Sequence, residues 1–356
     1  MRVLITAGEK SGFVLADLLS KKIRDISSEI EICYLDLTDV AGDAFGFTPK
    51  ILPKLLQGRR LLKRLLSSAL NCQPDLAVLI SMPTVNLHLG KKLRATGLTT
   101  VFIAPPQCWA WGEWRVRLLK QAADQVICLF SFEEHFFRQA GIRAVYFGYP
   151  FYDALQLEMS RREVYEMLGI PEDEEYIVLL PGTRKDEIDF HQLLFIRVFQ
   201  HLQMRHPRLH GVIVGGKESV LPPGVVQVGL QHRYDVFSWA RAALTVSGTV
   251  TAELAILGIP MVVSYHLEPV SRFLVRIFVR TPYFALPNII AGEAAVPEYL
   301  NPDQKQLISQ ISRLLDECDY RQTVIAKLGA VRRKLEPAGA TEQIARLIVG
   351  LLSGKS

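Results

Sequence analysis

Short apolar runs rich in β-branched residues alternate along the chain with longer amphipathic segments. The runs are 3–6, 76–80, 99–103, 125–129, 144–147, 176–180, 212–214, 243–246 and 261–264. Unbroken apolar strands separated by helix-length segments are typical of parallel sheets that are covered by helices on both faces. The pattern therefore predicts a doubly wound α/β fold.

The strand pattern starts again in the middle of the chain. A charged, helix-like segment at 161–175 ends in a turn and precedes a fresh strand and a glycine loop. The 356 residues also exceed what one compact core usually supports. We therefore predict two Rossmann-like domains, over 1–165 and 166–336, with the linker within 161–175. A last amphipathic helix, within 337–356, is expected to pack back on the domains.

Composition and charge exclude several classes of protein. Apolar residues make up 49% of the chain and charged residues 22%, which indicates a globular protein. No apolar stretch approaches the ~18 to 20 residues of a membrane-spanning helix, and the apolar run at the N-terminus is too short for a signal peptide. The net charge of +5 is mild and no recognition module is present, so nucleic acid is not an expected partner.

The cysteines are few and far apart. None belongs to a CxxC pair, so we expect reduced thiols and no structural zinc. They are Cys33, Cys72, Cys108, Cys128 and Cys318.

The strongest local signal lies after the run 243–246, where Ser247-Gly248-Thr249 leads into a helix. Such a helix start presents unpaired backbone N–H groups and the positive end of the helix dipole, which suits a diphosphate. Gly248 would let phosphate approach the backbone. Glu253 lies one turn further on the same helix face as Thr249, where a carboxylate can accept hydrogen bonds from ribose hydroxyls. An ordinary capped helix with a surface glutamate is the alternative.

A second loop, Pro181-Gly182-Thr183-Arg184, leaves the first strand of the same domain. Ligands of open α/β sheets bind outside the carboxyl ends of the strands, so Arg184 is expected to face the same site. A guanidinium there can bind phosphate oxygens in a bidentate way and stabilise charge on a departing diphosphate. A solvated loop arginine is the alternative reading.

Two loops of the first domain are expected to line the interdomain cleft. The segment 8–12 follows the first strand but is not GxGxxG, which argues against a dinucleotide site. The loop 104–115 holds three of the four tryptophans, and a loop rich in Trp and Pro after a strand favours a cleft wall over a core position. The residues assigned to the cleft from these loops are Gly8, Ser11, Gly12, Trp109 and Trp111.

Two segments have the pattern of a helix in a lipid interface. Between 49 and 74 there are six basic residues and no acid. On a helix, Leu61, Leu62, Leu65, Leu66, Ala69 and Leu70 would lie opposite Arg60, Lys63 and Arg64. In the second domain Arg272, Arg276 and Arg280 recur every four residues, with apolar residues opposite. A core-packed helix with a solvated basic face is the alternative for each, but two such helices favour an anionic membrane surface as a partner.

As a set, these motifs resemble those of the lipid-A-disaccharide synthases over nearly the whole chain. The likeness rests on 8–12, Phe45-Gly46-Phe47, Trp109-Ala110-Trp111, 179–184, 247–253, 260–265 and 286–292. It implies the GT-B fold and an inverting glycosyltransferase that joins a UDP-activated acylated amino sugar, UDP-2,3-diacylglucosamine, to a glycolipid acceptor, 2,3-diacylglucosamine 1-phosphate, with release of UDP.

The resemblance also implies that no metal or other cofactor is needed. It places the enzyme on the inner face of the cytoplasmic membrane of a Gram-negative-type bacterium, with a homodimer as one possible assembly. Its implied UDP-binding residues are Gly182, Thr183, Arg184, Ser247, Gly248, Thr249, Glu253 and Asn288. Arg184 would assist departure of the leaving group.

The first domain departs from the family pattern at acidic positions. Phe13, Ser81 and Thr84 stand where the family has aspartates, while Asn86 of the same motif is kept. Pro49 replaces a glutamate and Tyr149 a histidine. An inverting transfer needs a base at the acceptor hydroxyl, and the aspartate at position 81 is the family's leading candidate. We assign Ser81 and Asn86 to the acceptor side.

Three readings follow. The first is an active disaccharide synthase, or a close variant with another acceptor, whose base is a different residue such as Glu9 or Asp43. The second is a catalytically silent relative that still binds UDP-sugar or lipid. The third is a nucleotide-sugar epimerase on the same fold, which the signatures at 181–184 and 286–292 disfavour.

Overall fold

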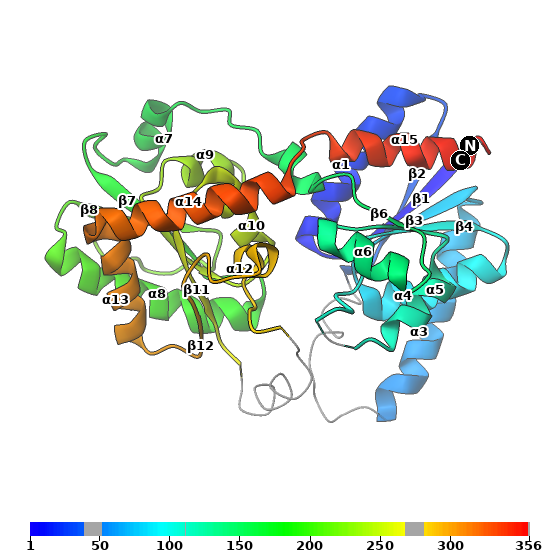
Figure 1. Ribbon diagram of the computed structural model, residues 1–356, viewed down its shortest axis with the longest axis horizontal. Helices are drawn as coiled ribbons and strands as arrows, with labels where there is room; N and C mark the ends of the chain where they lie inside the picture. The colour runs from blue at the N-terminus through cyan, green and yellow to red at the C-terminus, as the bar shows by residue number, and fades with distance from the viewer. Residues whose placement is uncertain (39–51, 111, 268–280, 355–356) are drawn as a thin grey trace. The chain divides into compact units, whose positions relative to one another are not determined.

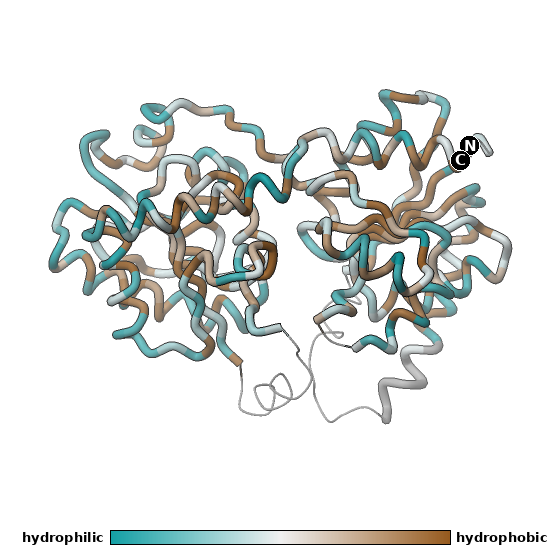
Figure 2. Tube along the Cα trace, viewed as in Figure 1, coloured by the Kyte–Doolittle hydropathy of each residue, from teal (hydrophilic) through white to brown (hydrophobic). Residues whose placement is uncertain are grey.

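The computed structural model of the chain describes residues 1–38, 52–110, 112–267 and 281–354 (Figure 1). Within these ranges the chain divides into two compact units. Unit 1 contains residues 1–154 and the C-terminal segment from 336, and unit 2 contains residues from 155 to 335. Figure 2 shows the apolar strands in the interior of each unit and hydrophilic turns on its outside.

Unit 1 is built on a parallel sheet with the strand order β2-β1-β3-β4-β5-β6. The strands are β1 (Arg2–Ala7), β2 (Glu31–Asp36), β3 (Leu76–Ile80), β4 (Thr99–Ile103), β5 (Gln125–Ile127) and β6 (Ala144–Val145). Helices α1 and α15 pack together on one face, and α3, α4 and α5 pack on the other (Figure 1). The helices are α1 (Lys10–Ile26), α3 (Leu52–Asn71), α4 (Pro83–Ala95), α5 (Arg115–Ala122), α6 (Ser131–Gln139), η1 (Pro150–Ala154) and α15 (Ala340–Leu352).

Unit 2 repeats the architecture with the strand order β12-β11-β10-β7-β8-β9. The strands are β7 (Glu175–Leu180), β8 (Leu209–Val214), β9 (Val225–Val228), β10 (Ala242–Val246), β11 (Met261–Tyr265) and β12 (Glu298–Leu300). Helices α8 and α13 pack together, as do α10, α12 and α14. The helices are α7 (Arg161–Leu168), α8 (Lys185–Arg205), α9 (Arg233–Ser238), α10 (Thr249–Leu257), α12 (Leu286–Ala291), α13 (Gln304–Asp316) and α14 (Cys318–Leu335).

These sheets confirm the predicted doubly wound α/β fold. The strands that the sequence pattern did not predict are β2, β9 and β12, and each lies at the edge of its sheet. An edge strand is covered on fewer sides, so its sequence mixes polar and apolar residues and lacks a continuous apolar run.

The boundary between the units falls at Ala154 and Leu155, and not at residue 165. The segment predicted as a linker contains α7, which belongs to unit 2. Tyr165 packs against Tyr176 of β7 with ring centroids 5.4 Å apart, and the Ser160 backbone N–H donates to the Glu163 carboxylate at 2.8 Å. The charges on the exposed face of this short helix account for the mistaken linker.

The C-terminal helix α15 returns to unit 1, where it packs on α1. The Asp153 carboxylate of η1 accepts hydrogen bonds from the backbone N–H groups of Gly339 at 2.6 Å and Thr341 at 2.8 Å. Because α15 begins at Ala340, this carboxylate fixes the start of the helix.

One pair of cysteines departs from the expectation of reduced thiols. Cys33 of β2 and Cys72, just after α3, form a disulfide with their Cα atoms 6.6 Å apart. Cys33 lies on an edge strand that the pattern did not predict, and 39 residues separate the pair, so no local signal pointed to it. Cys108 and Cys128 are buried thiols, and Cys318 is an exposed one.

Candidate active site

The two loops predicted to hold a diphosphate both lie at the carboxyl ends of the strands in the unit 2 sheet. β7 and β10 are adjacent parallel strands with Leu180 opposite Thr245, so the loops that follow them emerge side by side. Gly182 has φ of +113°, and a Cβ there would lie 2.7 Å from Glu187 Oε2 and 3.3 Å from Val246 Cγ2. The first loop therefore needs glycine for its conformation and for close packing on the second.

The Ser247-Gly248-Thr249 turn leaves the start of α10 accessible. Gly248 is exposed in an extended conformation, and nothing described lies within 4 Å of where its Cβ would be. The Ser247 hydroxyl donates to the Phe284 carbonyl at 2.8 Å, which ties the turn to the segment before α12. Within the described residues no side chain caps α10, so its first turn is open to an anion.

Arg184 precedes α8 at the same edge, and its side chain is 52% exposed. Its guanidinium lies 3.3 Å from Glu187 Oε1. Burial raises the pKa of Tyr265 at the end of β11, and the Arg184 guanidinium, which hydrogen-bonds the phenol, opposes that rise. Since β11 is adjacent to β10, the arginine spans the carboxyl ends of the central strands.

Glu253, which was predicted to meet a ribose, is buried in the described structure. Its carboxylate lies 3.6 Å from Nε of Arg233 in α9, and the Arg233 guanidinium lies 4.2 Å from the centre of the Tyr234 ring. Burial raises the pKa of Glu253, and Arg233 lowers it. Arg233 follows Gly229 and the end of β9, but β9 was not among the predicted strands, so the sequence did not single it out. A ribose contact of Glu253 stays a prediction.

Asn288 also has no exposed surface. Its amide donates to the Val296 carbonyl at 2.9 Å and accepts from the backbone N–H groups of Ala295 and Val296, both at 2.8 Å. These bonds close the loop 288–296 on itself. The structure therefore gives Asn288 a positioning role, and its direct contact with UDP stays a prediction.

Glu298, which the sequence did not single out, holds the backbone before α12 in place. Its carboxylate accepts from the backbone N–H groups of Ala285 at 2.7 Å and Phe284 at 3.3 Å. Burial raises the pKa of Glu298, and these backbone donors oppose the rise. Because Ser247 binds the Phe284 carbonyl, Glu298 fixes the segment that holds the phosphate turn.

In unit 1 the candidate acceptor residues lie at the carboxyl ends of β1 and β3, which are adjacent. Ser81 and Met82 have φ of 51° and 47°, which non-glycine residues rarely adopt. Asn86 is buried and donates to the carbonyls of Ile80 at 3.1 Å and Ser81 at 2.9 Å. Asn86 thus holds the turn that carries Ser81.

The first loop of unit 1 packs closely on that turn. A Cβ on Gly8 would lie 2.2 Å from Met82 Sδ, so the close approach requires glycine. Gly12 is buried in α1 with its nearest neighbour at ordinary contact distance, while Glu9 and Ser11 are half-buried. Phe13 is 38% exposed.

Trp109 packs on an aromatic cluster at the end of β5. Its ring meets that of Phe132 edge-on at 4.9 Å, and its indole N–H donates to Glu133 Oε1 at 3.0 Å. Glu133 is buried and also accepts from the backbone N–H groups of Leu129 at 3.0 Å and Phe130 at 3.2 Å. Burial raises the pKa of Glu133 to about 7. This carboxylate fixes Trp109.

Several predicted residues lie outside the described residues. They are Asp43, Phe45, Gly46, Phe47, Pro49, Trp111, Arg272, Arg276 and Arg280.

The described part of α3 corrects the prediction of a lipid-facing helix. Leu65 and Ala69 are buried, and Leu61, Leu62 and Leu66 are half-buried against the unit 1 core. This side of the helix therefore packs on the core, which is the alternative that the sequence left open, although Leu70 at its end is 38% exposed. Arg60, Lys63 and Arg64 form an exposed basic face. No helix in the described ranges is long and apolar enough to span a membrane.

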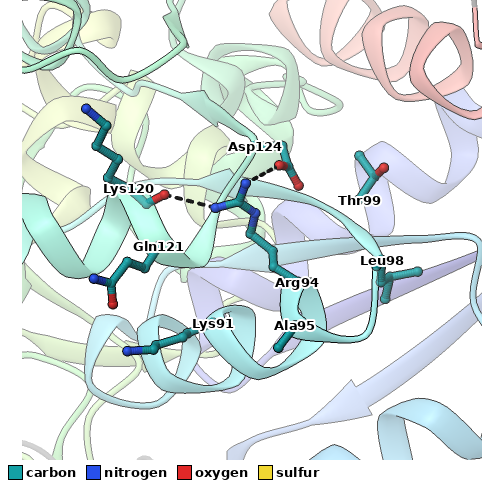
Figure 3. Close-up of a pocket in the computed structure, with 9 residues that line it drawn as sticks. Lys91, Arg94, Ala95, Leu98, Thr99, Lys120, Gln121 and Asp124 are labelled. Carbon is teal, nitrogen blue, oxygen red and sulfur yellow. Dashed lines mark hydrogen bonds and ion pairs between the residues drawn. The ribbon is translucent and has the colours of Figure 1, made fainter.

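A cavity of about 480 Å³ lies at the amino ends of the unit 1 strands, opposite the carboxyl ends that carry the candidate acceptor residues (Figure 3). Arg94 pairs with Asp124 at 2.5 Å there and donates to the Lys120 carbonyl at 2.9 Å. Because α4 and α5 end at this place, its cations face the negative ends of two helices.

The described residues contain no cluster of three or more His, Cys, Asp or Glu arranged to hold a metal.

Two six-stranded parallel sheets in one chain are the GT-B architecture of glycosyltransferases and UDP-sugar epimerases. The solved UDP-GlcNAc 2-epimerase of Neisseria meningitidis, bound to UDP-GlcNAc, matches with a TM-score of 0.68 and 13% identity over 98% of this chain and 100% of that one. At this identity the likeness shows the fold alone.

The model of the lipid-A-disaccharide synthetase family matches residues 3–336. The chain belongs to this family and is a glycosyltransferase. The lipid-A-disaccharide synthase of Geobacter sulfurreducens is 31% identical over 290 residues, which are 78% of this chain and 76% of that protein. That of Coxiella burnetii (strain CbuG_Q212) is 26% identical over 98% of each chain. These findings confirm the resemblance and the predicted GT-B fold.

Replacing Gly8 by alanine is expected to lower the free energy of unfolding by about 1–3 kcal/mol through overpacking. The added Cβ would lie 2.2 Å from Met82 Sδ and 2.8 Å from Leu37 Cβ. Gly12→Ala is the control: its Cβ would meet nothing nearer than 3.7 Å, and alanine favours a helix. Urea unfolding of both variants is the measurement, and equal losses would contradict the packing argument.

The stability of the protein should depend on pH through Glu133. Its pKa is raised from 4.5 to about 7, so the folded protein holds this proton more tightly than the unfolded chain. The stabilisation is complete below pH 4.5 and is lost as the pH rises through 7. Across that window the wild type should lose roughly 3 kcal/mol relative to Glu133→Gln. Urea titrations at both pH values test this, with Glu134→Gln as control, and parallel profiles for Glu133→Gln and wild type would refute it.

Proposed function

We propose that the protein joins UDP-2,3-diacylglucosamine to 2,3-diacylglucosamine 1-phosphate, with inversion at the anomeric carbon and release of UDP. The observation that carries the proposal is the pair of loops 181–184 and 247–249 at adjacent strand ends in a member of this family. The acceptor hydroxyl oxygen forms the new bond to C1 as the bond from C1 to the diphosphate oxygen breaks.

The donor side suits departure of a diphosphate. The electron pair of the breaking bond goes to the leaving oxygen, and negative charge grows on the UDP. The half-exposed Arg184 guanidinium and the open N-terminus of α10 are the groups that would offset this charge. We propose that these groups suffice without a metal cofactor, so that a chelator leaves turnover unchanged.

The acceptor side needs a carboxylate other than the ones that Ser81 and Thr84 replace. We propose Glu9, which follows β1 and precedes α1. β1 is adjacent to β3, so Glu9 and Ser81 stand at neighbouring strand ends. As a general base, Glu9 would take the proton of the acceptor hydroxyl as that oxygen attacks.

Purified protein given both substrates is expected to form one disaccharide 1-phosphate for each UDP released, as measured by mass spectrometry and a UDP assay. Arg184→Ala should lower the rate by about 10²–10³, and Glu9→Ala by about 10²–10⁴. Arg197→Ala, on the exposed side of α8, and Asp17→Asn, on α1, are the matched controls and should retain the rate.

A catalytically silent relative gives a different pattern. It would show no disaccharide, together with saturable UDP binding that Arg184→Ala abolishes. That result would overturn the synthase proposal and support a UDP-sugar-binding protein. Turnover that survives Glu9→Ala would remove Glu9 as the base.

We further propose that the protein binds an anionic membrane surface through the basic face of α3. Because Leu65 packs in the core and Leu61, Leu62 and Leu66 lie half-buried against it, the attraction rests on the exposed Arg60, Lys63 and Arg64. At about 1 kcal/mol for each basic residue, changing all three to Gln should weaken binding to vesicles containing phosphatidylglycerol roughly a hundredfold. Flotation measures this, with the triple change Lys21, Lys22 and Arg24 to Gln as control. Equal binding by both variants would refute it.

A further inference from the structure

We propose that Glu187 sets the affinity for the product UDP, by occupying with its own carboxylate the donors to which the diphosphate binds. The proposal rests on the function given above and concerns the donor half of that site. UDP would have to displace Glu187, and the returning carboxylate would help to expel it after transfer.

The contacts of Glu187 are those expected of a bound anion. Its Oε2 accepts from the backbone N–H groups of Thr183 at 3.3 Å and Arg184 at 3.4 Å. Its Oε1 lies 3.3 Å from Nη1 of Arg184. One carboxylate therefore uses two backbone donors and the guanidinium of the predicted phosphate loop.

The loop is shaped around this carboxylate. A Cβ at Gly182 would lie 2.7 Å from Glu187 Oε2, so glycine makes the room in which the side chain lies. The backbone at Glu187 is held within α8 itself, because Nδ1 of the buried His191, one turn further along the helix, lies 2.9 Å from the Glu187 carbonyl oxygen. The side chain can therefore leave the loop while the first turn of α8 stays in place.

The hold of Glu187 on these donors is loose. Strong hydrogen bonds between a charged donor and a carboxylate are about 2.7–2.9 Å long, whereas those of Glu187 are 3.3–3.4 Å. A diphosphate carries more negative charge and more acceptor oxygens, so it is the stronger ligand for the same groups. Two anions at one set of donors repel each other, and the carboxylate therefore lowers the affinity without abolishing binding.

Charge also distinguishes the product UDP from the substrate UDP-sugar. The terminal phosphate of UDP carries a further ionisable oxygen, which in UDP-sugar is esterified. The repulsion from Glu187 should therefore be larger for UDP than for the sugar nucleotide. Glu187 would act as a specificity-determining residue that favours release of UDP over release of the UDP-sugar.

The test is the affinity of the full-length protein for UDP, measured by calorimetry. Glu187→Gln keeps the size and the capping ability of the side chain but removes its charge, and should tighten UDP binding about tenfold. Asp186→Asn is the matched control, because Asp186 is an exposed acid in the same first turn of α8 and should change the affinity less than twofold. Glu187→Ser is a second variant that removes the carboxylate altogether and should tighten UDP binding in the same direction.

Unchanged or weaker UDP binding by Glu187→Gln would overturn the inference, as would equal tightening by Asp186→Asn, which would indicate a general effect of charge. If the wild type forms disaccharide while Glu187→Gln leaves UDP affinity unchanged, the inference fails and the proposed function stands. If Glu187→Gln tightens UDP binding but the wild type forms no disaccharide, the inference stands and the proposed synthase function fails. A wild type that binds no UDP would refute both.

Discussion

The parallel pairing of β7 with β10 is the constraint on which the candidate site depends. The ladder places Leu180 beside Thr245, so the chain leaves both strands at one edge of the sheet and in one direction. Gly182 can then pack on Val246, and the arginine of one loop lies at the same edge as the open helix start of the other. A slip in this register would move one loop along the strand direction relative to the other and separate the two anion-binding elements.

In each unit, polar side chains fix the loop backbone. In unit 2 the buried Asn288 closes the loop 288–296, and the half-buried Glu298 holds the segment that binds Ser247. In unit 1 the buried Asn86 holds the turn of Ser81. A buried amide or carboxylate must find partners, and loop backbone provides them. Asn288 and Asn86 thus resemble ligands in the sequence but act on the backbone.

The central strands and the site loops could be predicted because their signals are local. Continuous apolar runs mark β1, β3 and β4, and Ser247-Gly248 directly after the buried strand β10 marks the turn that opens α10. The edge strand β2 and the partner of Cys33 could not be predicted, since edge strands lack the apolar run and the disulfide joins residues 39 positions apart.

The roles of several site residues also escaped the sequence. The pairing of Arg233 with Glu253, and the return of Glu187 to its own loop, depend on how α8, α9 and α10 begin and pack. Whether the leucines of α3 face lipid or the protein core could not be predicted either, because their periodicity fits both surfaces equally well. The fold decides between these surfaces by placing Leu65 and Ala69 against the sheet.

A crystal structure of the protein with UDP tests the central claim most directly. The account predicts diphosphate oxygens within hydrogen-bonding distance of the Arg184 guanidinium and the backbone N–H groups that open α10, with the Glu187 carboxylate displaced from Thr183. A diphosphate bound elsewhere, such as in the cavity between Lys91 and Lys120, with Glu187 still on its loop, would contradict it.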